Sequence, residues 1–473
     1  MAGPVVQTDS GAVAGQGDQL RIFRGIPFAA PPLPRWRPPE PVTPWRGIRD
    51  ATAFGPDPMQ APPATLRGSG IAEDCLTLNV WTPVPAMGDR LPVMVWIFGG
   101  SFVYGSGSDQ GTDPAALARQ GVVVVTVNYR LGLFGFLAHP GLTAESPHGA
   151  SGNYGLLDQI AALRWVQTNI AGFGGDPGRV TVFGVSAGAA SIALMLTSPL
   201  ADGLFSQAIL QSPGSLRPLC PLERAEQAGF GLGADLERLR ALPAAELVAR
   251  TASFAPGVRS LTSPRVLRPI HDGWVVPEDE RPAYRGGRFR PVPMIVGNNA
   301  EEGRFFIDAL PIRSVEQYQA FVARNFGGAA EQALSYYPVA DAADVPAQLG
   351  HLFGDSQFNF GARGIARANA QRQAKTFRYL FTQPVGGRLP THTEELPFVF
   401  GTAEGPTTAA LMGAWRRFAA SGDPNGGDLP PWPRCTAGED PVLEFTQPLR
   451  PGTAWRGTQL DFLERYFDSH GRP

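Results

Sequence analysis

Two apolar runs in the first third of the chain have the pattern of strands that are buried on both faces. Residues 91–98 (LPVMVWIF) end in a Gly-Gly pair, and residues 122–127 (VVVVTV) are followed by Asn-Tyr-Arg. Continuous runs of this length, rich in β-branched residues, are typical of parallel strands covered on both sides. Residues 113–120 between them have helical composition. The pattern therefore predicts a strand–helix–strand unit.

The alternation of strand-like and helix-like segments continues after this unit. Residues 155–170 carry apolar residues every three or four positions, which predicts a long helix, and 187–196 predict a second one. The Gly-rich stretch 172–178 predicts a turn. Further short strands are predicted at 180–183, 207–210, 294–296 and 377–381. Such alternation is typical of the α/β class, so we expect a central, mostly parallel, twisted sheet flanked by helices.

Two stretches break the alternation. Residues 22–45 are rich in Pro and aromatic residues. Because Pro lacks the N–H donor and clashes inside a helix, we expect an irregular layer over the sheet there. Residues 214–269 are helical but less regular, which predicts an inserted helical cap region over about 214–290. We find no internal repeat or low-complexity linker, and therefore predict one domain over residues 1–473.

Composition narrows the class of protein. The 473 residues are 43% hydrophobic and 17% charged, which is a globular profile, and the formal net charge of −2 argues against a nucleic-acid partner. No apolar run is long enough to cross a membrane and no leader peptide is visible, so we expect a cytoplasmic protein without a membrane partner. Three cysteines fit a reducing compartment. The near absence of lysine, with Lys375 as the single one, favours a GC-rich bacterial source.

The segment Gly184-Val185-Ser186-Ala187-Gly188 fits the pattern G-x-S-x-G between a predicted strand and a predicted helix. A serine exposed on a sharp strand-to-helix turn needs small neighbours, and the helix N-terminus favours negative charge that develops beside it. This context makes Ser186 the candidate nucleophile. The alternative is a structural turn, since Gly and Ser are common in loops.

A serine nucleophile needs a general base and an acid that orients the base. In sites built on such a turn, the acid and then the base follow the serine along the chain. His392 comes late, after the predicted strand 377–381, and is the candidate base. A carboxylate just past the strand 294–296 could be the acid. Glu301 and Glu302 both stand there, and the residues alone leave the choice open.

An oxyanion hole needs backbone N–H groups opposite the nucleophile. Ala187 directly follows Ser186, and Gly100 and Ser101 follow the predicted strand 91–98. These three N–H groups are the candidates. We see no His/Cys cluster with the spacing of metal ligands, so we expect neither a metal nor a cofactor.

Several further segments match one known family, in the same order along the chain. They are residues 23–29 (FRGIPFA), 73–81 (EDCLTLNVW), 95–102 (VWIFGGSF), 127–132 (VNYRLG), 152–159 (GNYGLLDQ), 173–177 (FGGDP) and 421–425 (SGDPN). With the serine motif, they resemble the type-B carboxylesterase/cholinesterase-like family of the α/β-hydrolase fold, in particular its bacterial, para-nitrobenzyl-esterase-like members.

The resemblance implies the α/β-hydrolase fold and a triad of Ser186, Glu302 and His392. Glu302 is preferred over Glu301 because the family places its acid directly before a Gly. The resemblance also implies two structural ion pairs, Arg130 with Asp158 and Arg37 with Glu73. The expected partner is a small-molecule ester, and the expected state is a monomer or a homodimer.

Two positions depart from the family pattern. Val185 stands where the family has Glu, and Ser101 where it has a third glycine. Loss of the Glu favours small or medium neutral esters over cationic ones. The aromatic candidates for the substrate pocket are Phe254, Trp274, Phe305, Phe306 and Phe358, each of which could equally be core packing.

The leading hypothesis is thus a carboxylesterase that works through an acyl-enzyme. An acyl-transfer, lactone-forming or lactone-opening enzyme with the same triad is the first alternative. A non-catalytic binding module is the second, and it is less favoured because all three triad positions are filled.

Overall fold

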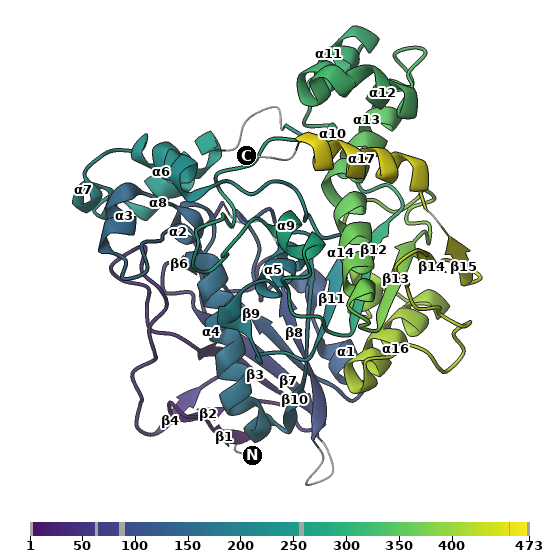
Figure 1. Cartoon of the computed structure of the whole chain (residues 1–473). Helices are drawn as coiled ribbons and strands as arrows, with labels where there is room; N and C mark the ends of the chain where they lie inside the picture. The colour runs from purple at the N-terminus through teal and green to yellow at the C-terminus, as the bar shows by residue number, and fades with distance from the viewer. Residues whose placement is uncertain (1–2, 62–64, 85–89, 255–259, 454, 471–473) are drawn as a thin grey trace.

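A ten-stranded mixed sheet flanked by helices runs through the molecule (Figure 1). The computed structural model describes residues 3–61, 65–84, 90–254, 260–453 and 455–470. From edge to edge, the sheet is formed by β15 (Arg450–Thr453), β14 (Pro441–Phe445), β13 (Thr376–Phe381), β12 (Met294–Asn299), β11 (Gln207–Gln211), β10 (Gly175–Val185), β8 (Leu91–Ile97), β9 (Val123–Val127), β7 (Thr77–Pro83) and β3 (Leu20–Pro27).

The strands from β9 to β14 are parallel to one another, and antiparallel pairs occur towards the edges. The larger helices are α4 (Tyr154–Asn169), α5 (Ala187–Met195), α11 (Val315–Phe326), α13 (Val345–Gly354), α14 (Phe360–Gln371), α16 (Pro406–Ser421) and α17 (Gly457–His470). Small sheets are formed by β1 (Val5–Gln7), β2 (Ala12–Ala14) and β4 (Ile48–Asp50), and by β5 (Asp57–Pro58) and β6 (Ile71–Ala72). The predicted mostly parallel sheet is thus confirmed.

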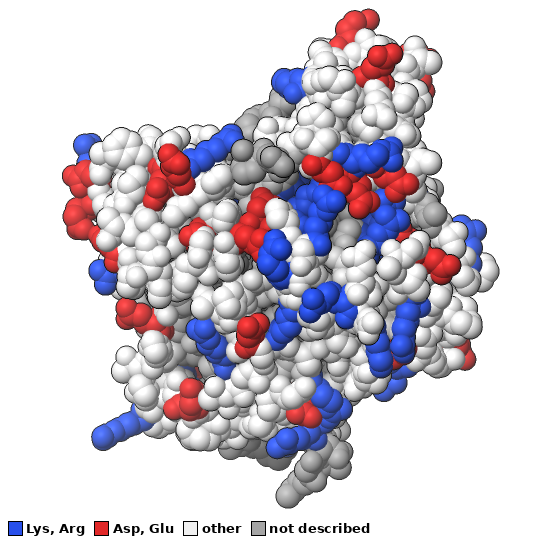
Figure 2. Space-filling model, in the orientation of Figure 1, with Lys and Arg blue, Asp and Glu red and all other residues white. Residues whose placement is uncertain are grey.

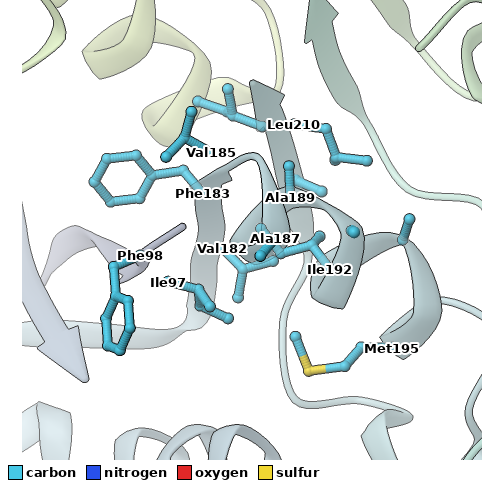
Figure 3. Packing of buried hydrophobic residues seen from close by; sticks show 14 of the residues in the cluster. Ile97, Phe98, Val182, Phe183, Val185, Ala187, Ala189, Ile192, Met195 and Leu210 are labelled. Carbon is cyan, nitrogen blue, oxygen red and sulfur yellow. The ribbon is translucent and has the colours of Figure 1, made fainter. Parts of the chain in front are cut away.

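The central strands are buried along most of their length, which is why apolar runs mark them in the sequence. Every residue of β9, β11 and β12 is buried, as is every residue of β8 after Leu91. Figure 3 shows how Ile97, Val182 and Ile192 bring the ends of β8 and β10 against α5. Each fully buried aliphatic side chain of this kind contributes about 1.5–3 kcal/mol to folding. The strands predicted from the sequence all match these elements, although 91–98 and 122–127 each extend one residue beyond the observed strand.

Three boundaries differ from the sequence prediction. The segment 22–45 is irregular only after Pro27, because its first residues belong to the edge strand β3, which pairs antiparallel with β7. The helix predicted at 113–120 is reduced to α1 (Ala115–Ala118), after a 3-10 turn at Gln110–Thr112. The predicted turn 172–178 ends early, since β10 begins at Gly175. This glycine pairs with Leu91 of β8, and the register shifts before the pairing resumes at Val180.

The cap region lies between β11 and β12. It contains α6 (Leu222–Phe230), α7 (Leu236–Arg240), α8 (Ala244–Thr251) and α9 (Glu280–Arg285), and the first three lie together near α3 (Pro140–Glu145) in Figure 1. Its proposed limits of about 214–290 stay a prediction.

A second insertion, between β12 and β13, was not predicted. Its short helix α10 (Arg304–Ile307) packs on α13, and α11 and α12 (Ala330–Tyr336) form a lobe that protrudes at the top of Figure 1. Between α13 and α14, the turn Asp355–Asn359 is π-helical. Such turns are rare and frequently mark functional sites.

Ion pairs hold the C-terminal helix against the rest of the molecule. Figure 2 shows basic and acidic side chains next to one another where α14 and α17 lie. Arg363 on α14 reaches Asp461 at 2.5 Å and Glu464 at 3.0 Å, both on α17. Because the two signs alternate here, this surface does not offer a single-sign patch to a polyanion.

The ion pair between Arg130 and Asp158 is buried at the start of α4. Two guanidinium nitrogens reach the carboxylate at 2.7 and 2.8 Å, and both side chains are almost fully buried. This confirms the first predicted pair. The second was wrong: Glu73 binds Arg35 at 2.6 Å, whereas the carbonyl oxygen of Arg37 accepts a hydrogen bond from Arg130.

Replacing Asp158 with Asn should lower the free energy of unfolding by about 3–5 kcal/mol, because the Arg130 guanidinium would stay buried without a counter-charge. Urea denaturation followed by fluorescence would measure the loss. The matched control is Arg288→Gln, which breaks an exposed pair with Glu278 and should cost at most about 1 kcal/mol. Equal losses in the two variants would contradict the structural role of the buried pair.

Candidate active site

Ser186 stands on the turn between β10 and α5. Its φ is 56°, an unfavourable value for a residue with a side chain, and its N–H donates to the carbonyl oxygen of Gln211 at 2.8 Å. This is the strand-to-helix turn that the sequence motif predicted, with a strained serine at its tip.

The two glycines of the motif are required by close packing against the end of β8. A Cβ atom on Gly188 would lie 2.0 Å from the carbonyl oxygen of Ile97, and one on Gly184 would lie 2.6 Å from the same oxygen. Both distances are far shorter than any van der Waals contact. The glycines therefore let α5 start directly beside the loop that follows β8.

That loop contains two of the three predicted oxyanion residues, and the third, Ala187, begins α5. Gly100 has a φ of 108° and Ser101 one of 55°, and a Cβ atom on Gly100 would clash with the carbonyl oxygen of Tyr104. Within the described part of the chain, the N–H groups of Gly100, Ser101 and Ala187 donate no hydrogen bond. Ser101 and Ala187 line the same cavity as Ser186, whereas Gly100 is not among its lining residues.

His392 and Glu302 are in direct contact. Nδ1 of the imidazole lies 2.5 Å from Oε2 of the carboxylate, and both side chains are buried. The other carboxylate oxygen accepts hydrogen bonds from Oγ of Ser212 at 2.5 Å and from the N–H of Asn299 at 2.7 Å. These donors hold the carboxylate in one orientation. Nε2 of His392 is buried and has no hydrogen-bond partner among the described residues.

The contact arises because β12 and β13 are parallel neighbours whose carboxyl ends meet at one edge of the sheet. The loop after β12 joins the loop after β13 through an isolated bridge between Glu301 and Thr391, and the N–H of Glu301 donates to Pro390 at 2.9 Å. The side chain of Glu301 points elsewhere, with Oε1 at 3.4 Å from Nε2 of His351. The structure therefore brings Glu302, and not Glu301, to His392.

Three neighbours of this pair were missed by the sequence reasoning. Ser212 and Asn299 stand at the carboxyl ends of β11 and β12, which is the signal that could have identified them. Glu395 is fully buried and accepts hydrogen bonds from Gln211 at 3.0 Å and Asn299 at 2.5 Å. Burial and, secondly, the nearby charge of Glu302 raise the pKa of Glu395.

A cavity opens beside Ser186, whose side chain is part of its lining. Phe306 and Phe358 line it, and the Phe358 ring centroid lies 4.4 Å from that of His392, so the imidazole stands at the cavity's edge. Two of the five aromatic candidates thus line the cavity. Phe305 is largely exposed and does not line it, but its ring centroid lies 6.1 Å from that of His392. Trp274 lines a separate cavity, and Phe254 is half-buried elsewhere.

The described residues contain no group of three or more His, Cys, Asp or Glu side chains that could hold a metal ion. Across the same residues, every helix is too short or too polar to cross a membrane.

Known proteins resemble this chain over most of its length. The profile of the carboxylesterase family matches residues 2–463. A fumonisin B1 esterase from Sphingopyxis macrogoltabida is 47% identical over 455 residues, which cover 91% of this chain and 84% of that protein. A para-nitrobenzyl esterase from Bacillus subtilis (strain 168) is 35% identical over 463 residues, covering 90% of this chain and 91% of the relative.

Among solved structures, a thermophilic PNB esterase superposes with a TM-score of 0.85 at 32% identity, over 97% of this chain and 99% of that one. Another PNB esterase gives a TM-score of 0.84, also at 32% identity and with the same coverage. The sheet order, the matched length and these identities leave no ambiguity about ancestry. The chain belongs to the carboxylesterase family, has the α/β-hydrolase fold, and is an enzyme that hydrolyses carboxylic esters.

Proposed function

We propose that Ser186, His392 and Glu302 are the catalytic triad of this esterase. The observation that carries the proposal is the contact of the buried Glu302 carboxylate with His392 Nδ1, beside a cavity that has Ser186 at its floor. A carboxylate at Nδ1 holds the proton there and leaves Nε2 as the base that faces the nucleophile. The unpartnered Nε2 of His392 fits this role.

The reaction then runs in two steps. Ser186 Oγ attacks the ester carbonyl while His392 takes its proton, and the N–H groups of Gly100, Ser101 and Ala187 stabilise the oxyanion. His392 returns the proton to the departing alcohol. Water, activated by the same base, then releases the acid from the acyl-enzyme.

The substrate class we infer is small or medium esters. Relatives are named for the hydrolysis of fumonisin B1 and of para-nitrobenzyl esters, which supports hydrolysis over acyl transfer and lactone chemistry. The cytoplasmic location and the monomeric or homodimeric state stay predictions.

A p-nitrophenyl ester series from acetate to dodecanoate tests the proposal, together with a fluorophosphonate probe and mapping of the labelled peptide. We expect Ser186 to be labelled, and turnover to release free acid with an optimum at short or medium chains. Labelling of another serine would overturn the assignment. Labelling of Ser186 with turnover only after addition of an alcohol would instead identify an acyltransferase.

A further inference from the structure

Three arginine side chains line the cavity over Ser186. Arg217 follows β11, whereas Arg265 and Arg268 belong to the stretch between α8 and α9. The described lining of this cavity contains no Asp or Glu. A wall with three guanidinium groups and no carboxylate is unusual for a pocket that takes neutral esters, because most ligand pockets are predominantly apolar.

The guanidinium groups are held in place by neutral oxygen atoms. Arg217 and Arg265 both donate to Oε1 of Gln357, the latter at 3.0 Å, and Gln357 belongs to the buried π-helical turn Asp355–Asn359. Arg217 and Arg268 also donate to the carbonyl oxygen of Gly214, at 3.4 and 3.2 Å. An amide or carbonyl oxygen orients a guanidinium group without neutralising its charge.

Arg268 is the most deeply buried of the three. Its side chain packs over the Phe102 ring, it is 5% exposed, and its Nε has no hydrogen-bond partner among the described residues. Burial lowers its pKa, with Glu280 and Asp279 acting in the opposite direction. Keeping such a charge inside a protein costs stability unless a partner satisfies it.

The two nearby carboxylates lie outside the cavity lining and are engaged with the backbone. Glu280 accepts a hydrogen bond from the N–H of Leu216 at 2.7 Å, and Asp279 from those of Leu219 at 2.7 Å and Arg281 at 3.1 Å. Both carboxylates therefore bind backbone N–H groups and are not among the described residues that line the cavity.

From this arrangement we propose that the cavity binds an anionic ester, one that carries at least one free carboxylate close to the ester bond attacked by Ser186. This inference rests on the proposed role of Ser186. Guanidinium groups match carboxylates in shape and charge, and a charge-assisted pair in a water-poor cavity is both strong and directional. A carboxylate bound there would meet guanidinium groups and no acidic side chain in the described lining of the cavity. The substrate would thus differ from the neutral esters that Val185 alone suggested.

The free carboxylate can stand on the acyl or on the alcohol side of the ester, and two substrate pairs distinguish these. In the first pair, monomethyl glutarate carries the charge on the acyl side, and methyl 5-amino-5-oxopentanoate is its neutral amide analogue. In the second pair, 4-acetoxybutanoate carries the charge on the alcohol side, and 4-acetoxybutanamide is its neutral analogue. We expect kcat/KM to favour the anionic member of at least one pair by about tenfold or more. Equal or lower values for the anionic member in both pairs would overturn the proposal.

Substitutions of the arginines that line the cavity test whether they cause the preference for the anionic ester. Arg265→Gln and Arg217→Gln should each reduce the anionic-to-neutral ratio at least about fivefold and raise the inhibition constant of glutarate, whereas Arg265→Lys should keep part of the preference. The control is Arg285→Gln, an exposed residue paired with Asp468, which should leave the ratio unchanged. An unchanged ratio in both cavity variants, with folding confirmed by thermal melting, would contradict the inference.

Ser186→Ala separates this inference from the proposed triad. If that variant still hydrolyses both members of a pair, the triad proposal fails. If hydrolysis depends on Ser186 but shows no preference for the anion, the anionic-substrate inference alone fails.

Discussion

Replacing Ser186 with Ala is expected to lower kcat for p-nitrophenyl acetate at least about a thousand-fold while leaving the fold intact. The hydroxyl is the atom that forms the acyl-enzyme, so the variant loses the covalent route and keeps the oxyanion donors and the cavity. Steady-state release of p-nitrophenol measures the loss, and circular dichroism with thermal melting checks folding. The small methyl group of Ala fits the same turn, so a large change in melting temperature is not expected.

The matched control is Ser191→Ala, which removes a fully buried serine hydroxyl from the helix that begins beside Ser186. Its activity should stay within about threefold of the wild type, because surface or core changes away from the reacting atoms act mainly on stability. If Ser186→Ala kept a tenth or more of the activity, the nucleophile would have to be sought elsewhere in the cavity.

The central sheet could be predicted because several of its strands appear in the sequence as apolar runs. The parallel strands β8 and β9 are covered on both sides, so each one is apolar at nearly every position. The edge strand β3 has no such signal, since its burial pattern is mixed and it ends at Pro27. The π-helical turn Asp355–Asn359 was beyond prediction for another reason: nothing in its residue pattern distinguishes it from the α-helices on either side.

The site was predictable where its chemistry is local. The strand-to-helix turn around Ser186 can be recognised from five consecutive residues, and the order of the candidates along the chain points to His392. The choice of acid depends on how two strand ends meet, which a one-dimensional pattern does not contain; resemblance to a family decided it in favour of Glu302. The cavity lining is harder to predict, because Arg217 and Arg265 lie far apart in the stretch between β11 and β12, and Gln357 comes from the insertion between β12 and β13.

Val185 is a departure from the family pattern whose meaning depends on the rest of the site. The residue is buried among apolar side chains beside the turn that carries Ser186, and Figure 3 shows it next to Phe183 at the end of β10. Because Val185 carries no charge, it does not attract cationic esters as the Glu of the family pattern would. The proposed preference for an anionic substrate rests instead on the three guanidinium groups that line the cavity.

Glu302→Gln is expected to lower kcat by about a hundred- to ten-thousand-fold, and Glu301→Gln by no more than a few-fold. The two residues are adjacent, but Oε2 of Glu302 lies 2.5 Å from Nδ1 of His392, whereas Oε1 of Glu301 lies 3.4 Å from His351. An amide at position 302 removes the charge that stabilises the imidazolium, and its NH₂ group favours the wrong imidazole tautomer.

Measuring kcat for p-nitrophenyl acetate in both variants, with melting temperatures beside them, tests this ordering. A loss of stability would accompany Glu302→Gln, because Ser212 and the N–H of Asn299 donate to the same carboxylate. Activity must therefore be compared well below the melting temperature of the weaker variant. If Glu301→Gln proved the more damaging, the acid would be Glu301, and His392 would have to leave its contact with Glu302 during the reaction. A small effect of both changes would mean that the nearby buried carboxylate of Glu395 can stabilise the imidazolium in place of Glu302.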